Sequence, residues 1–282
     1  MTIVVTGATG QLGHLIIEGL LAKGVTPSDI VAGGRKLEKL DDFASRGVIV
    51  KKLDYDDRGT LSNALVGVDV LMLVSASEPG HRVPQHIAVV DAAIAAGVKR
   101  IVYTSAPAAT TSALVLAPEH KATEEYIVAT GIPYSFLRNG WYTENYSDTF
   151  AKAKESGVVA QSAGDGRVSS ASRKDYADAA VAVLTSDDYE NAVYELSGDT
   201  AWSFDDFAAT AASVFGRDVV YQRLTPEEHV ARLMGFGLDE GTAGFVVALD
   251  GNIRDGLLGQ TSGDLKKLIG RPTTPLAEGL VT

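Results

Sequence analysis

The chain alternates between two patterns of hydrophobic and polar residues over roughly its first 140 positions. Short apolar runs rich in β-branched residues, typical of buried strands, are followed by longer stretches in which apolar residues recur at helical spacing. This alternation predicts a parallel sheet with helices on both faces. We expect strands over 3–6, 29–33, 48–53, 70–75, 100–105 and 134–137, and helices near 12–23, 37–46, 58–65, 82–96 and 119–130.

The pattern changes in the second half of the chain. Residues 174–185 and 192–197 predict one further helix and one further strand, which return to the sheet. After Gly198 come W-S-F-D-D-F-A-A-T-A-A-S-V-F-G and several short helical stretches separated by glycine, which indicate a smaller lobe. We therefore expect an α/β protein with a doubly wound sheet domain over 1–147 plus 174–197, and a smaller C-terminal α/β lobe on the substrate side over 148–173 plus 198–282.

Charge and composition exclude several classes of function. The formal net charge is −11, so the chain lacks the basic face that binding nucleic-acid phosphates requires. It has no cysteine, which excludes disulfides and thiolate chemistry and fits a reducing compartment. The five histidines lack the paired spacing of metal ligands, so no metal site is expected. Because no signal sequence and no apolar run of the roughly 20 residues that span a membrane is present, we expect a cytoplasmic protein.

Residues 6–13 read T-G-A-T-G-Q-L-G, between the first predicted strand and the first predicted helix. In that context Gly7 permits a tight turn, Gly10 lets the backbone approach a pyrophosphate, and Gly13 lets helix and strand pack closely. An ordinary strand-to-helix loop is the alternative. The position of the motif favours dinucleotide binding and a Rossmann-type sheet.

The end of the second predicted strand indicates which dinucleotide binds. An acidic residue at this place would bind the ribose 2′-hydroxyl of NAD. The chain reads A-G-G-R-K instead, and the guanidinium of Arg35 suits the 2′-phosphate of NADPH. A solvated basic pair, Arg35 and Lys36, at the start of a helix is the alternative reading. Asp54, after the third strand, is the expected neighbour of the adenine.

Several further segments resemble a known family. They include S-A-S-E-P-G-H-R-V-P-Q-H at 75–86, V-Y-T-S at 102–105, F-L-R-N-G-W-Y-T-E-N-Y at 136–146, A-G-D-G-R at 163–167 and L-I-G-R-P-T-T at 268–274. With the glycine motif and the A-G-G-R turn, they resemble the NmrA-like atypical short-chain dehydrogenases/reductases, and most strongly the type 2 NAD(P)H:quinone oxidoreductases. The resemblance extends over essentially the whole chain.

The resemblance implies a place for each part of NADPH. The pyrophosphate would lie on residues 7–12, the 2′-phosphate on Arg35, the ribose side on residues 75–77 and the nicotinamide end on residues 139–144. Together with the residues that end predicted strands, this gives as expected cofactor-binding residues Gly7, Thr9, Gly10, Gln11, Leu12, Gly13, Arg35, Asp54, Ser75, Ala76, Ser77, Thr104, Ser105, Lys121, Asn139, Gly140, Trp141, Tyr142 and Glu144.

The expected acceptor pocket lies at the same rim of the sheet. Residues 75–77, 104–105 and 139–142 all follow predicted strands, and the carboxyl ends of parallel strands meet at one edge. Trp141, Tyr142 and Tyr146 gather there, and flat aromatic surfaces suit a planar apolar acceptor. We expect Asn139, Trp141 and Tyr142 to act in catalysis, with Asn139 and the backbone after it orienting the ring. The alternative, that the aromatic residues fill the joint between the lobes, stays open for Tyr146.

One feature departs from the pattern of many short-chain reductases. These carry Tyr-x-x-x-Lys on the helix after the fifth strand, where the tyrosine donates a proton and the lysine lowers its pKa and holds the ribose. In V-L-A-P-E-H-K, Lys121 takes the lysine position and Ala117 the tyrosine position, so the acid is missing. A quinone tolerates this, because its reduced anion, with a conjugate-acid pKa of about 10, is a far weaker base than a ketone's alkoxide and needs on the order of 8 kcal/mol less stabilisation.

We therefore expect an NADPH-dependent reductase that passes hydride directly from nicotinamide to a bound quinone, without a flavin. Two alternatives remain, both from related NmrA-like proteins. One is reduction of another delocalised electrophile such as a triarylmethane dye. The other is a sensor without turnover that reports the NADPH/NADP ratio to a partner, which the missing tyrosine favours and the aromatic rim does not. The sequence is compatible with a homo-oligomer but does not set the oligomeric state.

Overall fold

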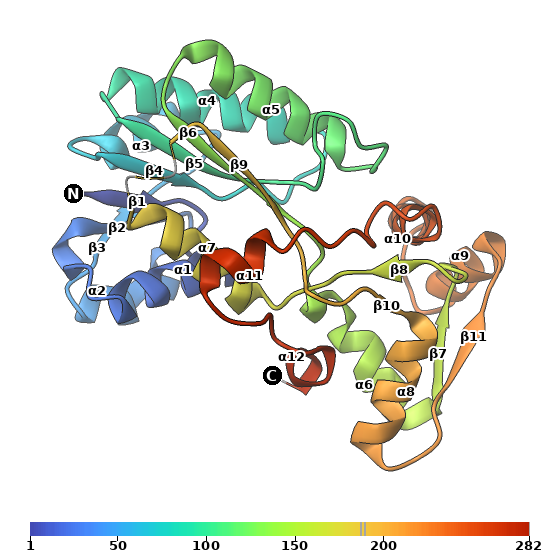
Figure 1. Cartoon of the computed structure of the whole chain (residues 1–282). Coiled ribbons are helices and arrows are strands. Elements are labelled where there is room, and N and C mark those ends of the chain that lie inside the picture. The colour runs from blue at the N-terminus through green and yellow to red at the C-terminus, as the bar shows by residue number, and fades with distance from the viewer. Residues whose placement is uncertain (187, 189, 282) are drawn as a thin grey trace.

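The computed structural model describes residues 1–186, 188 and 190–281, and it has a large lobe and a smaller one (Figure 1). In this described part of the chain, seven parallel strands form the sheet of the large lobe in the order β3-β2-β1-β4-β5-β6-β9. The order reverses between β1 and β4, and ligands of such sheets bind at this point, beyond the carboxyl ends of the strands. The strands are β1 (Ile3–Val5), β2 (Ile30–Gly34), β3 (Ile49–Lys52), β4 (Val70–Leu73), β5 (Arg100–Ser105), β6 (Tyr134–Asn139) and β9 (Ala192–Leu196). The predicted doubly wound α/β fold is confirmed.

Helices cover both faces of the sheet, as the sequence predicts (Figure 1). One face packs against α1 (Gln11–Ala22), α2 (Asp41–Ser45), α7 (Arg173–Leu184) and α11 (Asp264–Ile269), and the other against α3 (Arg58–Leu65), α4 (Arg82–Ala95) and α5 (Ala117–Thr130). Short 3-10 turns, η1 (Pro27–Asp29) and η2 (Leu37–Leu40), lie before β2 and before α2, so the helix predicted near 37–46 is divided in two.

The glycine motif forms the turn between β1 and α1. Gly7 has a φ of +59°, which residues with a side chain rarely adopt. A Cβ on Gly13 would lie 2.4 Å from the carbonyl oxygen of Gly7, so only glycine lets the helix approach the strand this closely. Both residues therefore have the conformational roles that the sequence motif predicts.

The smaller lobe draws its elements from two parts of the chain. The first part gives η3 (Thr143–Tyr146), α6 (Ser147–Ser156), β7 (Val158–Gln161) and β8 (Arg167–Val168). The second gives β10 (Trp202–Ser203), α8 (Phe204–Phe215), β11 (Val220–Arg223), α9 (Pro226–Gly235), α10 (Glu240–Arg254) and α12 (Leu276–Val281). The two parts are joined because β11 pairs with β7 in parallel and β10 pairs with β8 in antiparallel orientation. That the two lobes are separate domains stays a prediction.

An aromatic cluster forms the core of the smaller lobe. The ring of Tyr146 packs edge-on against Trp202, Phe204 and Phe207, with centroids 5.1, 5.5 and 5.9 Å away. Such edge-to-face packing adds to the free energy gained by burying the rings. Tyr146 therefore belongs to the core of this lobe, which decides the alternative that the sequence leaves open.

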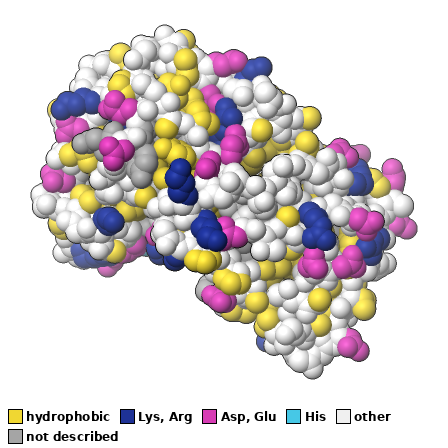
Figure 2. All heavy atoms as spheres, viewed as in Figure 1, with side chains coloured by type: hydrophobic (Ala, Val, Ile, Leu, Met, Phe, Trp, Pro, Cys, Tyr) yellow, Lys and Arg dark blue, Asp and Glu magenta, His cyan; other side chains and the backbone are white. Residues whose placement is uncertain are grey.

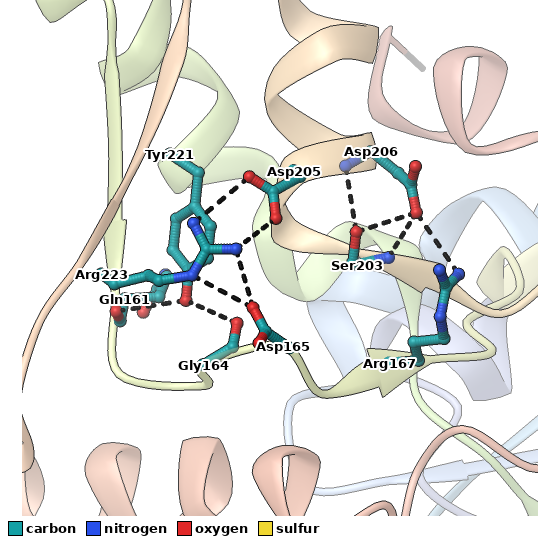
Figure 3. Close-up of polar contacts among 9 residues, drawn as sticks. All are labelled: Gln161, Gly164, Asp165, Arg167, Ser203, Asp205, Asp206, Tyr221 and Arg223. Atoms are coloured by element: carbon teal, nitrogen blue, oxygen red, sulfur yellow. Dashed lines mark hydrogen bonds and ion pairs between the residues drawn. The ribbon is translucent and has the colours of Figure 1, made fainter.

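Ion pairs hold the surface of the same lobe together (Figure 3). Arg223 at the end of β11 binds Asp165 at 2.8 Å and Asp205 of α8 at 2.5 Å. Ser203 and Asp206 form a capping box that starts α8, and Arg167 contacts the same Asp206 carboxylate at 3.4 Å. These contacts fix the strand pairs of the lobe against α8.

A buried Ser-His-Asp group in this lobe is structural. Ser162 Oγ and Asp250 Oδ2 both contact the same ring nitrogen of His229, Nδ1, at 3.0 and 3.1 Å. A serine nucleophile needs the base and the orienting carboxylate on opposite ring nitrogens, so this group cannot act as a catalytic triad. It instead ties β7 to α9 and α10.

Candidate functional site

A cavity of about 650 Å³ opens at the carboxyl ends of β1, β2, β3, β4, β5 and β6. Every residue that the sequence predicts to bind the cofactor lines this cavity, except Lys121 and Glu144. Residues that follow six different strands therefore meet in one place, as the doubly wound topology requires. In the part of the chain that the structure describes, no group of three or more His, Cys, Asp or Glu residues could hold a metal ion.

The glycine loop forms one wall of the cavity. Gly10 is the N-cap residue of α1 and supplies no side-chain cap, so the backbone N–H groups of the first turn of this helix are open to a ligand. Uncapped helix N-termini bind phosphate groups, because these N–H groups and the helix dipole favour negative charge. This end of the cavity therefore suits a pyrophosphate.

Arg173, at the start of α7, joins the same cavity, and sequence reasoning missed it. Its guanidinium lies 4.9 Å from the centre of the Tyr142 ring, a cation–π contact. Its backbone N–H donates to Glu144 Oε1 at 2.8 Å, and this carboxylate lies outside the cavity. Glu144 thus positions Arg173 instead of lining the site. The motif around Glu144 gave no sign of Arg173, because only the folded chain brings α7 beside η3.

The loop after β4 is held from behind by α4. Ala76 donates its N–H to His86 Nε2 at 2.9 Å, and its carbonyl accepts from Arg82 Nε at 2.8 Å. Ser75 donates its N–H to Thr104 Oγ1 at 2.8 Å, which ties this loop to the end of β5. Both backbone groups of Ala76 are therefore paired, and the loop presents a fixed surface to the cavity.

Two buried polar atoms lie at the far end of the cavity. Ser105 Oγ and Asn139 Oδ1 have no hydrogen-bond partner among the described residues. Buried polar atoms are usually paired, so unpaired ones in a cavity wall indicate where a ligand donates or accepts. Nδ2 of Asn139 donates to the hydroxyl of Tyr142 at 3.5 Å. Burial raises the pKa of this hydroxyl. This end can bind an amide or a hydroxyl group.

Gly140, directly after Asn139, has no room for a side chain. A Cβ at this position would lie 2.8 Å from the Leu196 carbonyl oxygen and 2.9 Å from the Tyr176 hydroxyl. The next residue, Trp141, lines the cavity and also packs against the core of the smaller lobe. The segment 139–142 is thus both a wall of the cavity and the crossing between the lobes.

The helix expected to carry the Tyr-x-x-x-Lys pair presents different residues to the cavity. Lys121 does not line the cavity; its ammonium is exposed and lies 3.9 Å from Glu125 on the same helix. Leu116 and His120, each one position earlier than the predicted pair, line it instead. Lys121 lies outside the cavity because successive helical side chains are rotated by about 100°, so an offset of one residue turns a side chain away from the cavity.

Figure 2 shows basic and acidic side chains interspersed on the visible face of both lobes. In the described residues no helix is both long and apolar enough to cross a membrane.

Comparison with known proteins decides the family. Residues 1–254 match the NmrA-like family. The chain belongs to that family. Among its relatives, quinone oxidoreductase 2 of Escherichia coli strain K12 is 47% identical over 278 residues, which is 99% of this chain and 97% of that protein. The NmrA-like resemblance predicted from the sequence motifs is thus confirmed.

Two solved structures agree closely with this fold. The NADPH complex of the E. coli NADPH-dependent quinone oxidoreductase has a TM-score of 0.95 and 46% identity, with 99% of both chains covered. The NADP(H) complex of the Citrobacter sp. triphenylmethane reductase has a TM-score of 0.95 and 41% identity, again over 99% of both chains.

Proposed function

We propose that the protein is an NADPH-dependent reductase that transfers a hydride directly from nicotinamide to a bound quinone. The observation behind this proposal is that one cavity joins a glycine-rich phosphate loop to a wall that includes Leu114, Leu116 and Trp141. The similarity to the E. coli quinone reductase, over 99% of this chain, supports it.

The residues of the cavity fit NADPH part by part. The turn at Gly7 and the uncapped start of α1 would hold the pyrophosphate, and Arg173 adds a positive charge nearby. Arg35 would bind the 2′-phosphate. The unpaired Ser105 Oγ and Asn139 Oδ1 would pair with the ribose and carboxamide of the nicotinamide end. When bound, NADPH supplies the hydride, and the work of these residues is to hold the ring in place.

The remaining wall suits a planar apolar acceptor. Leu114, Leu116, Trp141 and Tyr142 line the cavity beside the nicotinamide end. Leu116 brings an alkyl group to the place where a tyrosine acid would have to face the ligand. We therefore expect quinones, whose reduced form is a stabilised anion, to react and simple ketones to react poorly.

A second candidate is reduction of a triarylmethane dye. The specific observation in its favour is the 41% identity and full-length structural agreement with the Citrobacter sp. triphenylmethane reductase. A dye cation also accepts hydride without needing a proton, so the same apolar wall would serve it. Dye and quinone would then differ only in how well each fills the space around Trp141.

The test is the oxidation of NADPH by the purified protein, followed by the absorbance of the reduced nicotinamide, with a benzoquinone, with a triarylmethane dye and with neither. Rapid oxidation with the quinone and slow oxidation with a simple ketone are expected. Faster reaction with the dye would favour the second candidate. Tight NADPH binding without turnover on either acceptor would overturn both and favour the sensor reading.

A further inference from the structure

Three buried side chains link the loop after β4 to the acceptor end of the cavity. His86 of α4, Tyr103 of β5 and His120 of α5 are all less than about a tenth exposed. The Tyr103 hydroxyl lies 2.8 Å from Nδ1 of His120 and 3.4 Å from Nδ1 of His86. The proposed cofactor contacts and acceptor wall involve neither Tyr103 nor His120, and His120 is the one of the three that lines the cavity.

The position of each proton follows from the contacts. The N–H of Ala76 donates to Nε2 of His86, so this nitrogen carries no proton and Nδ1 of the neutral ring does. That Nδ1–H faces Thr123 Oγ1 at 3.0 Å, and Thr123 in turn donates to the Glu119 carbonyl at 2.9 Å. His86 is therefore fixed as one tautomer by a backbone group.

The hydrogen bond of Tyr103 sets the tautomer of His120 in turn. Because Nδ1 of His86 already bears a proton, the Tyr103 hydroxyl cannot donate to it and donates to Nδ1 of His120 instead. The neutral ring of His120 then carries its proton on Nε2. Since the Nδ1 edge faces Tyr103, inside the protein, the Nε2 edge is the one turned to the cavity.

The surroundings keep both rings neutral. Burial, with the positive charge of Arg82, lowers the pKa of His120 to about 3, and burial, His120 and Arg82 lower the pKa of His86 to about 3. The carboxylates on α5 do not offset this, because Glu119 pairs with Arg82 at 3.2 Å and Glu124 pairs with Arg138 at 2.6 Å. His120 therefore meets a ligand as an uncharged donor over the whole neutral range of pH.

We propose that the Nε2–H of His120 is a preorganised hydrogen-bond donor to the quinone oxygen that gains negative charge when the hydride arrives, with Tyr103 and His86 as positioning residues. The proposal rests on the quinone reductase function above. A donor already oriented toward developing charge stabilises the transition state without having to reorganise.

The donor is not an acid in this reaction. The hydride brings two electrons and one hydrogen nucleus to the quinone, which becomes a hydroquinone monoanion, while the nicotinamide becomes its oxidised form. The second proton comes later from solvent. His120 keeps its only N–H proton throughout, because a neutral imidazole does not release it near neutral pH. The hydride-transfer rate should therefore lack a pH dependence due to His120.

Two measurements test the proposal. The first is the ¹⁵N spectrum of histidine-labelled protein in complex with NADP⁺, with the His120 signals assigned by their loss in His120→Gln. We expect a neutral Nε2–H tautomer for His120 from pH 5 to 8, and this readout does not depend on turnover. Protonated Nδ1 on His120, or titration near pH 6.5, would contradict the tautomer argument.

The second measurement is the single-turnover rate of NADPH oxidation by a benzoquinone. His120→Leu, which has no donor, is expected to lose about tenfold to a hundredfold, while His120→Gln, whose amide can still donate, stays within about fivefold. Tyr103→Phe should fall between them and show mixed tautomers of His120. Glu125→Gln, on the exposed side of α5, is the matched control and should react as the parent does.

Three other outcomes would contradict the donor role of His120 or the quinone reductase function on which it rests. A parental rate in His120→Leu removes the donor role. A weakened NADPH affinity with an unchanged rate would assign His120 to the cofactor ribose instead. A parent protein that oxidises no NADPH with quinone removes the proposed function itself, and the donor role with it.

Discussion

Arg35 and Glu78 form an ion pair across the mouth of the cavity, with Nη1 of Arg35 3.1 Å from Oε1 of Glu78. The other carboxylate oxygen of Glu78 accepts from Gln85 at 3.2 Å, and Gln85 also donates to Asp56 at 3.0 Å. The guanidinium proposed to bind the 2′-phosphate thus already has a carboxylate partner. A phosphate must share Arg35 with Glu78 or displace it, so Glu78 opposes NADPH in a way that it does not oppose NADH.

Glu78→Gln should therefore strengthen NADPH binding. Both side chains are largely exposed, and an exposed ion pair contributes roughly 0.2 to 1 kcal/mol, so a gain of about 1.5-fold to fivefold in affinity is expected. Fluorescence titration with NADPH and NADH measures it. Equal gains for both cofactors would show that Glu78 acts on something other than the 2′-phosphate.

Arg35→Ala should have the opposite effect and a larger one. Losing one charge-assisted contact is expected to weaken NADPH by about tenfold to a hundredfold and to leave NADH nearly unchanged. Measuring kcat/KM of the variant and the parent with NADPH and with NADH tests this selectivity. If both weaken equally, Arg35 does not bind the 2′-phosphate.

Trp141→Ala tests the acceptor wall. The substitution removes an aromatic surface from the cavity, so the KM for benzoquinone should rise about tenfold while the Kd for NADPH changes little. Because Trp141 also packs against the smaller lobe, a modest fall in Tm is expected, and Trp141→Phe should restore most of both. An unchanged KM with a large loss of Tm would make Trp141 a core residue only.

Stability should depend on pH through His86 and His120. Both have a folded-state pKa of about 3, whereas an unfolded histidine takes up its proton near 6.5. Between these values the unfolded chain binds more protons, so the free energy of unfolding falls as the pH falls from about 6.5 toward 3. At pH 5 the loss is up to about 2 kcal/mol for each ring.

Urea unfolding of the parent and of His120→Gln at pH 7 and pH 5 isolates this effect. The variant lacks one of the two rings, so its loss of stability between the two pH values should be smaller by up to about 2 kcal/mol. Equal losses in parent and variant would mean that His120 is protonated in the folded state.

The centre of the sheet could be predicted from the sequence because β1, β2 and β4 are runs without charged residues that are buried throughout. Met72 and Val102 face one layer of helices while Leu71 and Ile101 face the other, and all four are buried. In the smaller lobe this signal is missing. There β8 and β10 have two residues each, and no hydrophobic period can be read from so short a run.

Residues of the cavity could be predicted where a single motif supplies a whole loop. They could not be predicted where the rotation of a helix decides which side chains face the cavity, or where a residue comes from a distant part of the chain. Which residues of α5 face the ligand depends on rotation about the helix axis, so the sequence pattern pointed to Lys121 and the fold presents His120. Arg173 reaches the cavity from α7, and no local pattern links it to the glycine loop. Conversely, the segment 139–142 was predictable because it directly follows a buried strand.

The helix α12 closes the smaller lobe, with Leu280 in the same apolar cluster as Ala106, Leu114, Tyr146 and Trp202. This core therefore combines residues from the first half of the given sequence with residues from α12, far along the chain. During synthesis the aromatic side chains of α6, β10 and α8 emerge from the ribosome well before their final partner does. The nascent chain must keep this apolar surface from other proteins until α12 has been made. All seven strands of the large-lobe sheet are present once β9 has been made, so that sheet can form before the core of the smaller lobe does.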